Sequence, residues 1–181
     1  KGEAVRQGML QVAREDRYGL IGFWDADMAV PLEEIADFYY LMQRHPHIKG
    51  TIASRIHLAG RNIERVNLRH YLGRFFATVM SFTFDLVVYD TQCGAKAFRR
   101  SPVFEAALRT PFTSRWAFDV ELLGRLVTPQ PGGLDPLLED AFVEVPLRAW
   151  HDVKGSKLSP RAALGAGFDL LRIAATLQRR R

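Results

Sequence analysis

The sequence predicts an α/β domain in which a mostly parallel central sheet is flanked by helices. Two short apolar runs, 18–24 and 48–54, read as buried strands, and each lies next to a stretch with the three-to-four-residue spacing of an amphipathic helix. Strands that alternate with helices favour parallel pairing, because a helix supplies the crossover between neighbouring parallel strands. The 181 residues are enough for one domain with a sizeable core, so we expect a single domain over residues 1–181.

The elements are predicted from local patterns in chain order. Apolar residues at helical spacing indicate a first helix over 2–16, and the run 18–24 indicates the first strand. Ser159 and Pro160 form the N-cap and first-turn pair of a last helix. Further helices are expected at 31–44, 65–84, 102–109 and 118–127, further strands at 48–54, 96–98 and 142–150, and an irregular polar stretch at 56–67.

Charge and cysteine content narrow the possible partners. The formal net charge is +5 and the pI is about 9.7, which suits an anionic partner such as a nucleotide, a phosphorylated lipid or an acidic membrane surface. The single cysteine, Cys93, excludes an intrachain disulfide and is consistent with a reducing compartment. No run approaches the roughly 18 uncharged apolar residues of a spanning helix.

Two aspartates end the first predicted strand. Asp25 and Asp27 follow the apolar run directly, and Pro31 then opens a helical pattern, so both should lie at the carboxyl end of a buried strand. Ligands bind at that edge in open α/β sheets. A hard divalent cation between the two carboxylates would relieve their repulsion, and Mg²⁺ held in this way usually also contacts substrate phosphates. The alternative is a simple turn, in which aspartate is common.

Three further polar groups are candidates for chemistry. Arg55 and Arg69 flank the polar stretch, and arginine binds phosphate through a fixed bidentate fork, although solvated or ion-paired arginines are the plainer interpretation. A dense polar turn spans 90–96. Asp119 and Glu121 begin a helix among apolar neighbours, where Asp119 is either functional or an N-cap. A glycine-rich phosphate loop of the P-loop or dinucleotide type is absent from the sequence.

Five short motifs, taken in order, resemble the family 2 glycosyltransferases, in particular the dolichyl-phosphate glucosyltransferase and dolichyl-phosphate mannose synthase branch. The resemblance runs from Lys1 to about residue 177, and Lys1-Gly2 with Ala4-Val5-Arg6 is similar to the family segment just before the Asp-x-Asp motif. The five motifs are Asp25-Ala26-Asp27, Ser54-Arg55, Asp90-Thr91-Gln92-Cys93-Gly94-Ala95-Lys96-Ala97-Phe98, Arg115-Trp116-Ala117-Phe118-Asp119-Val120-Glu121-Leu122-Leu123 and Gly155-Ser156-Lys157-Leu158.

The resemblance implies a GT-A nucleotide-diphospho-sugar transferase fold and a set of site residues. Asp25 would face the nucleotide and, with Asp27, hold Mg²⁺ or Mn²⁺ against the diphosphate. Arg55 and Arg69 would meet the lipid phosphate and the sugar diphosphate, and Ser156 and Lys157 would lie in a loop that closes over the phosphates. The matched motifs add four candidate substrate-binding residues: Lys1, Gln92, Lys96 and Trp116.

The implied reaction is inverting transfer of a hexose from a nucleotide-diphosphate sugar to a polyprenyl phosphate. Ala29 stands where the mannose branch often carries glutamine, which favours glucose. A phosphate acceptor is already anionic and needs cationic positioning, whereas a hydroxyl acceptor needs a general base. Asp119 or Glu121 would be that base or would fix an arginine. A hydroxyl acceptor and a non-catalytic remnant that binds phosphate or membranes remain as alternatives, and the aspartate pair disfavours nucleic acid.

The resemblance also places the family's first strand before Lys1, so we expect the domain to be N-terminally incomplete. The acceptor lies in a bilayer, which implies a protein that is peripheral at the cytoplasmic face of the membrane. The aromatic-rich helix at 65–84 and the last helix, with Arg172 and its terminal arginines, are the candidate contacts, although a core role for the first of them is the alternative. The oligomeric state stays open.

Overall fold

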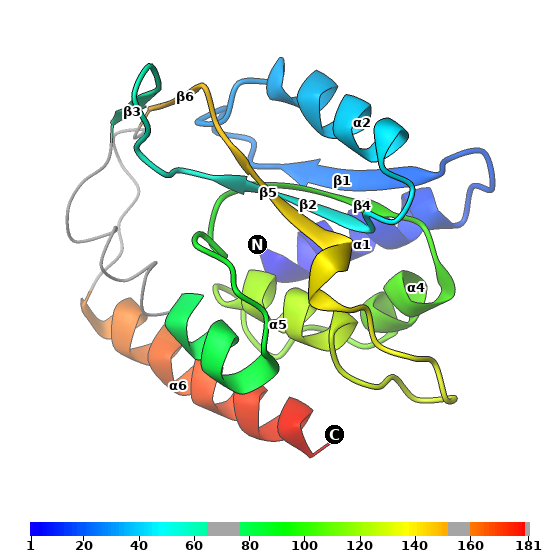
Figure 1. The fold of residues 1–181 in the computed structure, drawn as a ribbon. Helices are drawn as coiled ribbons and strands as arrows, with labels where there is room; N and C mark the ends of the chain where they lie inside the picture. Colours follow the sequence, from blue (N-terminus) through cyan, green and yellow to red (C-terminus); the bar gives the residue numbers. More distant parts are fainter. Residues whose placement is uncertain (65–76, 152–159, 180–181) are drawn as a thin grey trace.

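A computed structural model describes residues 1–64, 77–151 and 160–179. Figure 1 shows the arrangement of the elements along the chain. The helices are α1 (Gly2–Ala13), α2 (Glu34–Arg44), α4 (Pro102–Arg109), α5 (Phe118–Leu126), the 3₁₀ helix η1 (Glu139–Ala141) and α6 (Pro160–Gln178), and residues 77–84 are also helical. The strands are β1 (Leu20–Trp24), β2 (Gly50–Ser54), β3 (Asn62–Glu64), β4 (Ala95–Arg99), β5 (Phe142–Pro146) and β6 (Ala149–His151).

The central sheet has four strands in the order β1-β4-β2-β5. β4 runs antiparallel to both neighbours, and β2 and β5 are parallel, so three of the four strands run in one direction. The α/β fold with a helix-flanked sheet is therefore confirmed, and the sheet, predicted to be mostly parallel, is mixed, with one parallel and two antiparallel strand pairings. β4 lies between β1 and β2 and runs against both, and this one reversed strand makes the sheet mixed.

Helices cover the two faces of the sheet unequally (Figure 1). On one face α2 packs through Phe38 into a smaller cluster that includes Ala53, Ala95 and Trp150. The other face carries α1, α4, α5 and α6, and its larger core contains Ile21, Ile52 and Phe98 from the sheet among many helical side chains. Successive residues of one strand enter different cores, as Ile52 and Ala53 of β2 do, because neighbouring side chains along a strand point to opposite faces of the sheet.

Two expectations about local structure were wrong. The predicted strand over 142–150 is two strands, β5 and β6, separated at Leu147 and Arg148. Leu147 N–H donates to Ser54 O, which ends the central sheet, and β6 then pairs with β3 in a separate two-stranded sheet. The stretch predicted to be irregular contains β3 for this reason. A three-residue strand is too short to leave a recognisable alternation in the sequence.

The other elements agree with the sequence patterns to within a few residues. The predicted helix over 65–84 is helical at 77–84, and its first part lies outside the described residues. Ser101 shows the local chemistry that sets such boundaries, because its side chain accepts a hydrogen bond from Phe104 N–H and Pro102 occupies the first turn of α4.

The close pairing of β1 and β4 depends on Gly22. A Cβ atom at this position would lie 2.6 Å from Lys96 O and 3.2 Å from Ala97 Cα, both of which are backbone atoms that cannot rotate away. We expect Gly22→Ala to lower the free energy of unfolding by about 1–3 kcal/mol, because the two strands must separate locally to accept the methyl group.

Gly8→Ala is the matched control for this prediction. Gly8 lies in α1, and a Cβ there would meet no atom within 4 Å, so the substitution should be neutral or stabilising by about 0.5–1 kcal/mol through helix propensity. Guanidinium denaturation of both variants measures the difference. Equal stabilities would show that the two strands are not held at this distance in solution.

Candidate functional site

Three strand ends and one strand start meet at one edge of the central sheet. Trp24, the last residue of β1, pairs with Ala95 at the start of β4, and Ser54, the last residue of β2, pairs with Pro146 at the end of β5. We call this the polar edge. Asp25, Arg55 and the turn before β4 all continue from it, so the topology brings together residues that are far apart in the sequence.

Asp25 is fixed at the polar edge by contacts to two distant residues, Lys1 and Gly94. Its backbone N–H donates to Gly94 O at 2.7 Å, and its Oδ2 accepts from Lys1 Nζ at 2.6 Å. A Cβ on Gly94 would lie only 2.1 Å from Asp25 Oδ2. The carboxylate therefore occupies the space that a side chain at position 94 would take, and the Gly94 in the motif is explained by this close approach.

Asp27 lies in the same turn and is exposed. Met28 N–H donates to Asp25 O at 3.1 Å, and Ala29 N–H donates to Asp27 Oδ1 at 3.1 Å. Met28 has a φ of 55°, a left-handed conformation that makes the turn tight. The predicted aspartate pair thus extends from a single tight turn, with one carboxylate half-buried and the other open to solvent.

Asp25 and Asp27 are the residues that would hold a divalent ion together with substrate phosphates. The described residues contain no group of three or more His, Cys, Asp or Glu side chains that would hold a metal by themselves. Mg²⁺ commonly takes one or two protein carboxylates and completes its shell with phosphate oxygens and waters. The cation that now contacts Asp25 is the Lys1 ammonium group, so this carboxylate already lies in a position where it accepts positive charge.

Arg55 follows β2 and forms a bidentate ion pair with Asp90. Arg55 Nε and Nη2 donate to the two Asp90 oxygens at 2.7 and 2.8 Å, and the Arg55 backbone N–H donates to Oδ2 at 3.1 Å. The guanidinium carbon lies 5.2 Å from the Trp150 ring centroid. Burial lowers the pKa of Arg55, but the Asp90 carboxylate raises it by more, so the pKa ends above its ordinary value and Arg55 stays charged.

The turn that carries Asp90 is held by Glu144 of β5, a residue that the sequence did not single out. Tyr89 N–H and Asp90 N–H donate to the two Glu144 oxygens at 2.6 and 2.9 Å. Asp90 stood in a recognised motif without a role, and Glu144 gave no signal because an acidic residue in a strand usually indicates its solvent side. Only the pairing of β2 with β5 brings Glu144 near the turn.

Lys96 and Asp119, both predicted site residues, form a buried ion pair. Lys96 Nζ donates to Asp119 Oδ1 at 2.6 Å and to Cys93 O at 2.7 Å, and the Lys96 side chain is fully buried. Burial raises the pKa of Asp119 above its ordinary value, and the Lys96 charge offsets only part of that rise. The pair joins β4 to the start of α5, directly beneath the polar edge.

Glu121 lies on a different side of α5 from Asp119, because two residues along a helix turn by roughly 200°. Glu121 Oε1 accepts from Arg125 Nη2 at 2.6 Å, and Oε2 accepts from Thr113 N–H at 2.8 Å. Arg125 in turn donates to the carbonyls of Ala107, Thr110 and Pro111. Of the two roles expected for Glu121, base or partner of an arginine, this geometry corresponds to the second.

The remaining predicted residues differ in burial, and three of them lie outside the described residues. Gln92 Nε2 and Thr91 Oγ1 are buried beside Asp90 and have no hydrogen-bond partner among the described residues. Trp116 is 45% exposed. Cys93 is buried, which raises the pKa of its thiol to about 12 and makes it inert. Arg69, Ser156 and Lys157 lie outside the described residues.

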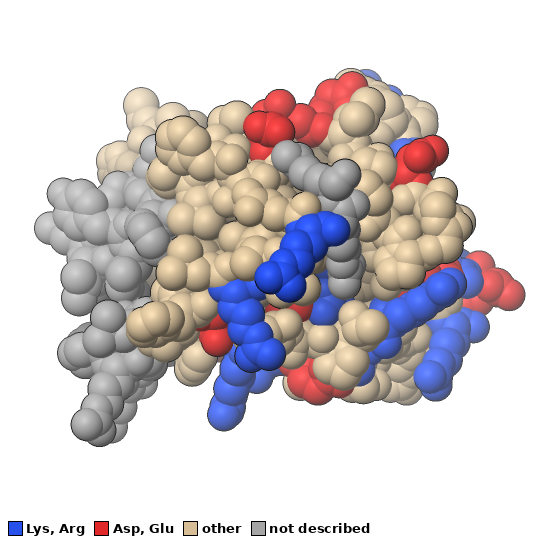
Figure 2. Space-filling model, turned by 90° about the horizontal axis from the view of Figure 1, so that it is seen from below, with Lys and Arg blue, Asp and Glu red and all other residues tan. Residues whose placement is uncertain are grey.

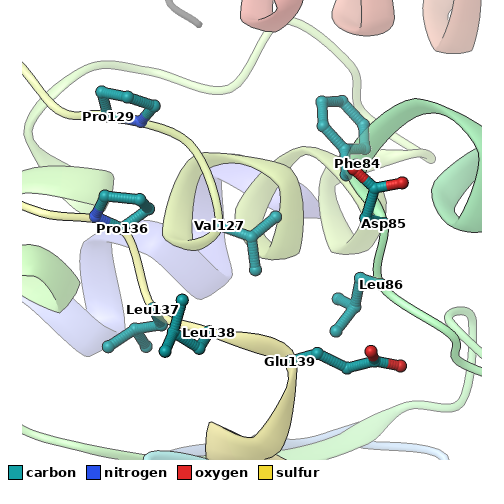
Figure 3. A pocket seen from close by; sticks show the side chains of 9 residues that line it. All are labelled: Phe84, Asp85, Leu86, Val127, Pro129, Pro136, Leu137, Leu138 and Glu139. Carbon is teal, nitrogen blue, oxygen red and sulfur yellow. The ribbon is translucent and has the colours of Figure 1, made fainter.

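A separate hollow lies away from the polar edge, between the end of helix 77–84 and the loops that follow α5 (Figure 3). Phe84, Leu86, Val127 and Leu137 give it an apolar lining, with Asp85 and Glu139 as its carboxylates. None of the predicted site residues lines it. The candidate site is therefore the polar edge and not this hollow.

Several curated proteins similar to this chain carry the same name. A dolichyl-phosphate beta-glucosyltransferase of Saccharomyces cerevisiae is 31% identical over 173 residues, which is 88% of this chain and 46% of the relative. The chain is similar to the dolichyl-phosphate glucosyltransferases. The protein of the same name from Drosophila melanogaster is 34% identical over 176 residues (88% of this chain, 46% of the relative), and that from Mus musculus is 34% identical over 181 residues (94% and 50%).

These matches confirm the resemblance inferred from the five motifs and show that the homologues are glycosyltransferases. The chain spans about half the length of the curated relatives it matches. No protein-family model matches it. Within the described residues of this glucosyltransferase-like chain, no helix has the length and apolar character needed to cross a membrane.

The Lys96–Asp119 pair gives a stability prediction. Lys96→Met should lower the free energy of unfolding by about 3–5 kcal/mol, because it leaves Asp119 buried without its counter-charge. With Lys96 gone, burial alone raises the Asp119 pKa, so the folded state binds a proton more tightly than the unfolded state does. The variant should therefore lose further stability as the pH rises above the usual range of a carboxyl group.

Guanidinium denaturation between pH 4 and 8 measures this effect. The double variant Lys96→Met/Asp119→Leu removes both charges and should recover most of the lost stability, with a flatter pH dependence. If the double variant were no more stable than Lys96→Met, Lys96 and Asp119 would not be each other's main charge partners.

Proposed function

We propose that this chain forms part of a metal-dependent glycosyltransferase that moves a hexose, glucose in the first instance, from a nucleotide-diphosphate sugar to a polyprenyl phosphate such as dolichyl phosphate. The observation that carries the proposal is the polar edge itself. An aspartate pair and an arginine held in a bidentate ion pair come from different strands and converge where ligands bind in α/β sheets. The relatives are named as dolichyl-phosphate beta-glucosyltransferases, and these names supply the sugar and the acceptor of the proposal.

Asp25 and Asp27 would hold the divalent ion, Mg²⁺ or Mn²⁺, in the assignment that the resemblance implies. The ion would offset negative charge on the leaving diphosphate. Lys1, at 2.6 Å from Asp25, would contribute a second positive charge on the donor side of the site. Gln92 supports the same assignment, because its Nε2 is buried with no hydrogen-bond partner among residues 1–64, 77–151 and 160–179, and such an amide suits a substrate hydroxyl or phosphate oxygen.

The state of the acidic residues favours a phosphate acceptor over a hydroxyl acceptor. A hydroxyl acceptor requires a carboxylate that is free to take a proton. Asp119 is paired with Lys96, and Glu121 is paired with Arg125 and with the backbone of Thr113. A phosphate monoester needs no base, and Arg55, together with Arg69 as the resemblance implies, would position it. The GT-A assignment is compatible with the mixed, helix-flanked sheet.

We propose the underside of the molecule as the surface that meets the cytoplasmic face of a membrane. Lys and Arg side chains gather over the middle and lower part of that face, with some Asp and Glu side chains beside them (Figure 2). Phe168 and Leu171 of α6 are 73% and 62% exposed, and Phe82 of the helical segment 77–84 is 86% exposed. Arg172 and Arg179 are exposed on or just after the same helix. Exposed aromatic and aliphatic residues beside arginines are typical of interfacial helices.

Asp27→Ala tests the metal assignment. The variant should lose Mn²⁺-dependent binding of nucleotide-diphosphate sugars and hexose transfer to polyprenyl phosphate, because the one remaining carboxylate, Asp25, is already paired with Lys1 and would hold the ion much more weakly. Calorimetry with a panel of nucleotide sugars, with and without Mn²⁺, measures binding, and a radiolabelled-sugar assay measures transfer.

Asp135→Ala is the control, since Asp135 is also an exposed aspartate but lies in the loop before β5. If Asp27→Ala retained metal-dependent binding, the metal assignment would be wrong. A wild-type chain that bound no nucleotide sugar in any condition would instead favour the second candidate, a non-catalytic phosphate-binding or membrane-binding protein, which the basic face also fits.

A further inference from the structure

The orientation of Arg55 is determined by Asp90. The Asp90 carboxylate is buried at 1% exposure and accepts hydrogen bonds from the Arg55 backbone N–H, from Arg55 Nε and Nη2, and from Gln92 N–H at 3.3 Å. The bidentate contact fixes the plane of the guanidinium group as well as its position. Any displacement of Asp90 would therefore be passed directly to Arg55.

Asp90 itself lies on a turn outside the sheet, and Glu144 connects that turn to the sheet. Glu144 is on β5, where it pairs in register with Ile52 of β2. Its two carboxylate oxygens accept the backbone N–H groups of Tyr89 and Asp90 at 2.6 and 2.9 Å, and the Ser54 hydroxyl also bonds to it. Ser54 directly precedes Arg55, so Glu144 links the end of β2 to the turn that carries the partner of Arg55.

We propose that Glu144 is a positioning residue that sets the orientation of Arg55 by holding the Tyr89–Asp90 turn against β5 and β2. The inference rests on the proposed function, in which Arg55 binds a phosphate group of the substrates. Glu144 would not touch the substrate itself. It would affect phosphate binding through Asp90 and Arg55.

A carboxylate is required at this position because two adjacent N–H donors need two acceptors. Glutamine has nearly the same shape but offers one acceptor oxygen, and its NH₂ group would face one of the two backbone donors. The turn would then move to relieve the donor–donor contact, and Asp90 would move with it. Burial of an unsatisfied donor is costly, so the displaced turn would not simply return to its place.

Glu139 offers a matched control from the same part of the chain. Glu139 Oε1 accepts a backbone hydrogen bond from Val87 at 3.2 Å, so it also joins the region before β5 to the segment that leads into the turn. This hydrogen bond ends at Val87 and not at Asp90 or Arg55. Glu144→Gln and Glu139→Gln therefore make the same chemical change. Glu144 binds the turn itself, whereas Glu139 binds Val87, two residues before Tyr89.

The experiment compares the full 181-residue chain with the variants Glu144→Gln, Glu139→Gln and Arg55→Ala. Two-dimensional ¹H–¹⁵N NMR follows the Arg55 Nε–H signal, which reports the bidentate contact, and its hydrogen exchange. Calorimetry with inorganic pyrophosphate and Mg²⁺ measures phosphate binding. We expect Glu144→Gln to shift the Arg55 signal, to speed its exchange and to weaken pyrophosphate binding by about three- to tenfold, while Glu139→Gln matches the wild type.

The two readouts separate failure of this inference from failure of the proposed function. If Arg55→Ala weakens pyrophosphate binding but Glu144→Gln leaves both binding and the Arg55 signal unchanged, Glu144 is not a positioning residue and the proposed function stands. If Arg55→Ala has no effect on binding, the phosphate role of Arg55 is wrong, and a shifted Arg55 signal in Glu144→Gln still supports the link between the two residues.

Glu144→Asp keeps the inference testable if Glu144→Gln fails to fold. Aspartate retains the charge and both acceptor oxygens but is one methylene shorter, so it should give an intermediate shift of the Arg55 signal and an intermediate loss of pyrophosphate affinity. An unchanged Arg55 signal in a folded Glu144→Asp variant, with unchanged affinity, would overturn the proposal.

Discussion

Three ion pairs hold together the edge of the sheet where the candidate site lies. Lys1 contacts Asp25, Arg55 contacts Asp90 and Lys96 contacts Asp119, and in each pair the partners come from different elements. A charge at a partly buried edge is tolerated only when an opposite charge or several hydrogen bonds compensate it. This constraint explains why residues 1, 25, 55, 90, 96 and 119, dispersed over the chain, converge within one region of the fold.

The three pairs differ in burial, and therefore in how far a ligand can reach their charges. Lys96 and Asp119 are fully enclosed, so their pair serves the structure beneath the site. The Lys1 and Asp25 side chains are 38% and 22% exposed, which leaves this pair accessible to a ligand that competes for either charge. Arg55 lies between these extremes at 13%, held rigidly by Asp90 but still at the surface of the edge. Rigidity with partial access suits a group that must meet a phosphate in one orientation.

The sequence predicted a large part of this arrangement because much of it is local. The end of β1, the aspartate turn after it and the start of α4 depend on neighbours within a few residues, and their chemistry can be read directly. The motifs also located Gly94 and Lys96, but they could not assign roles. The sequence predicted Lys96 as a substrate-binding residue and Asp119 as a base or the partner of an arginine, and the fold adds that each contacts the other.

The errors have a common physical cause. β3 and β6 exist because they pair with each other, and strands of three residues have no periodicity of their own. Glu144 became important only when β5 was placed beside β2, since no pattern along one strand reveals what approaches its side chain from a distant turn. Both features are products of contacts that are remote in sequence.

By itself, the sequence therefore determined the α/β class, the family resemblance, the acidic turn after the first strand and the basic character of the chain. These properties follow from composition, from short-range spacing and from motif order. The tertiary structure decided which charges compensate one another and which side chains stay open to a ligand, because partner choice depends on strand order and register. The antiparallel insertion of β4 between β1 and β2 is the decisive step, since it brings Gly94 against Asp25 and carries Lys96 beneath the same edge.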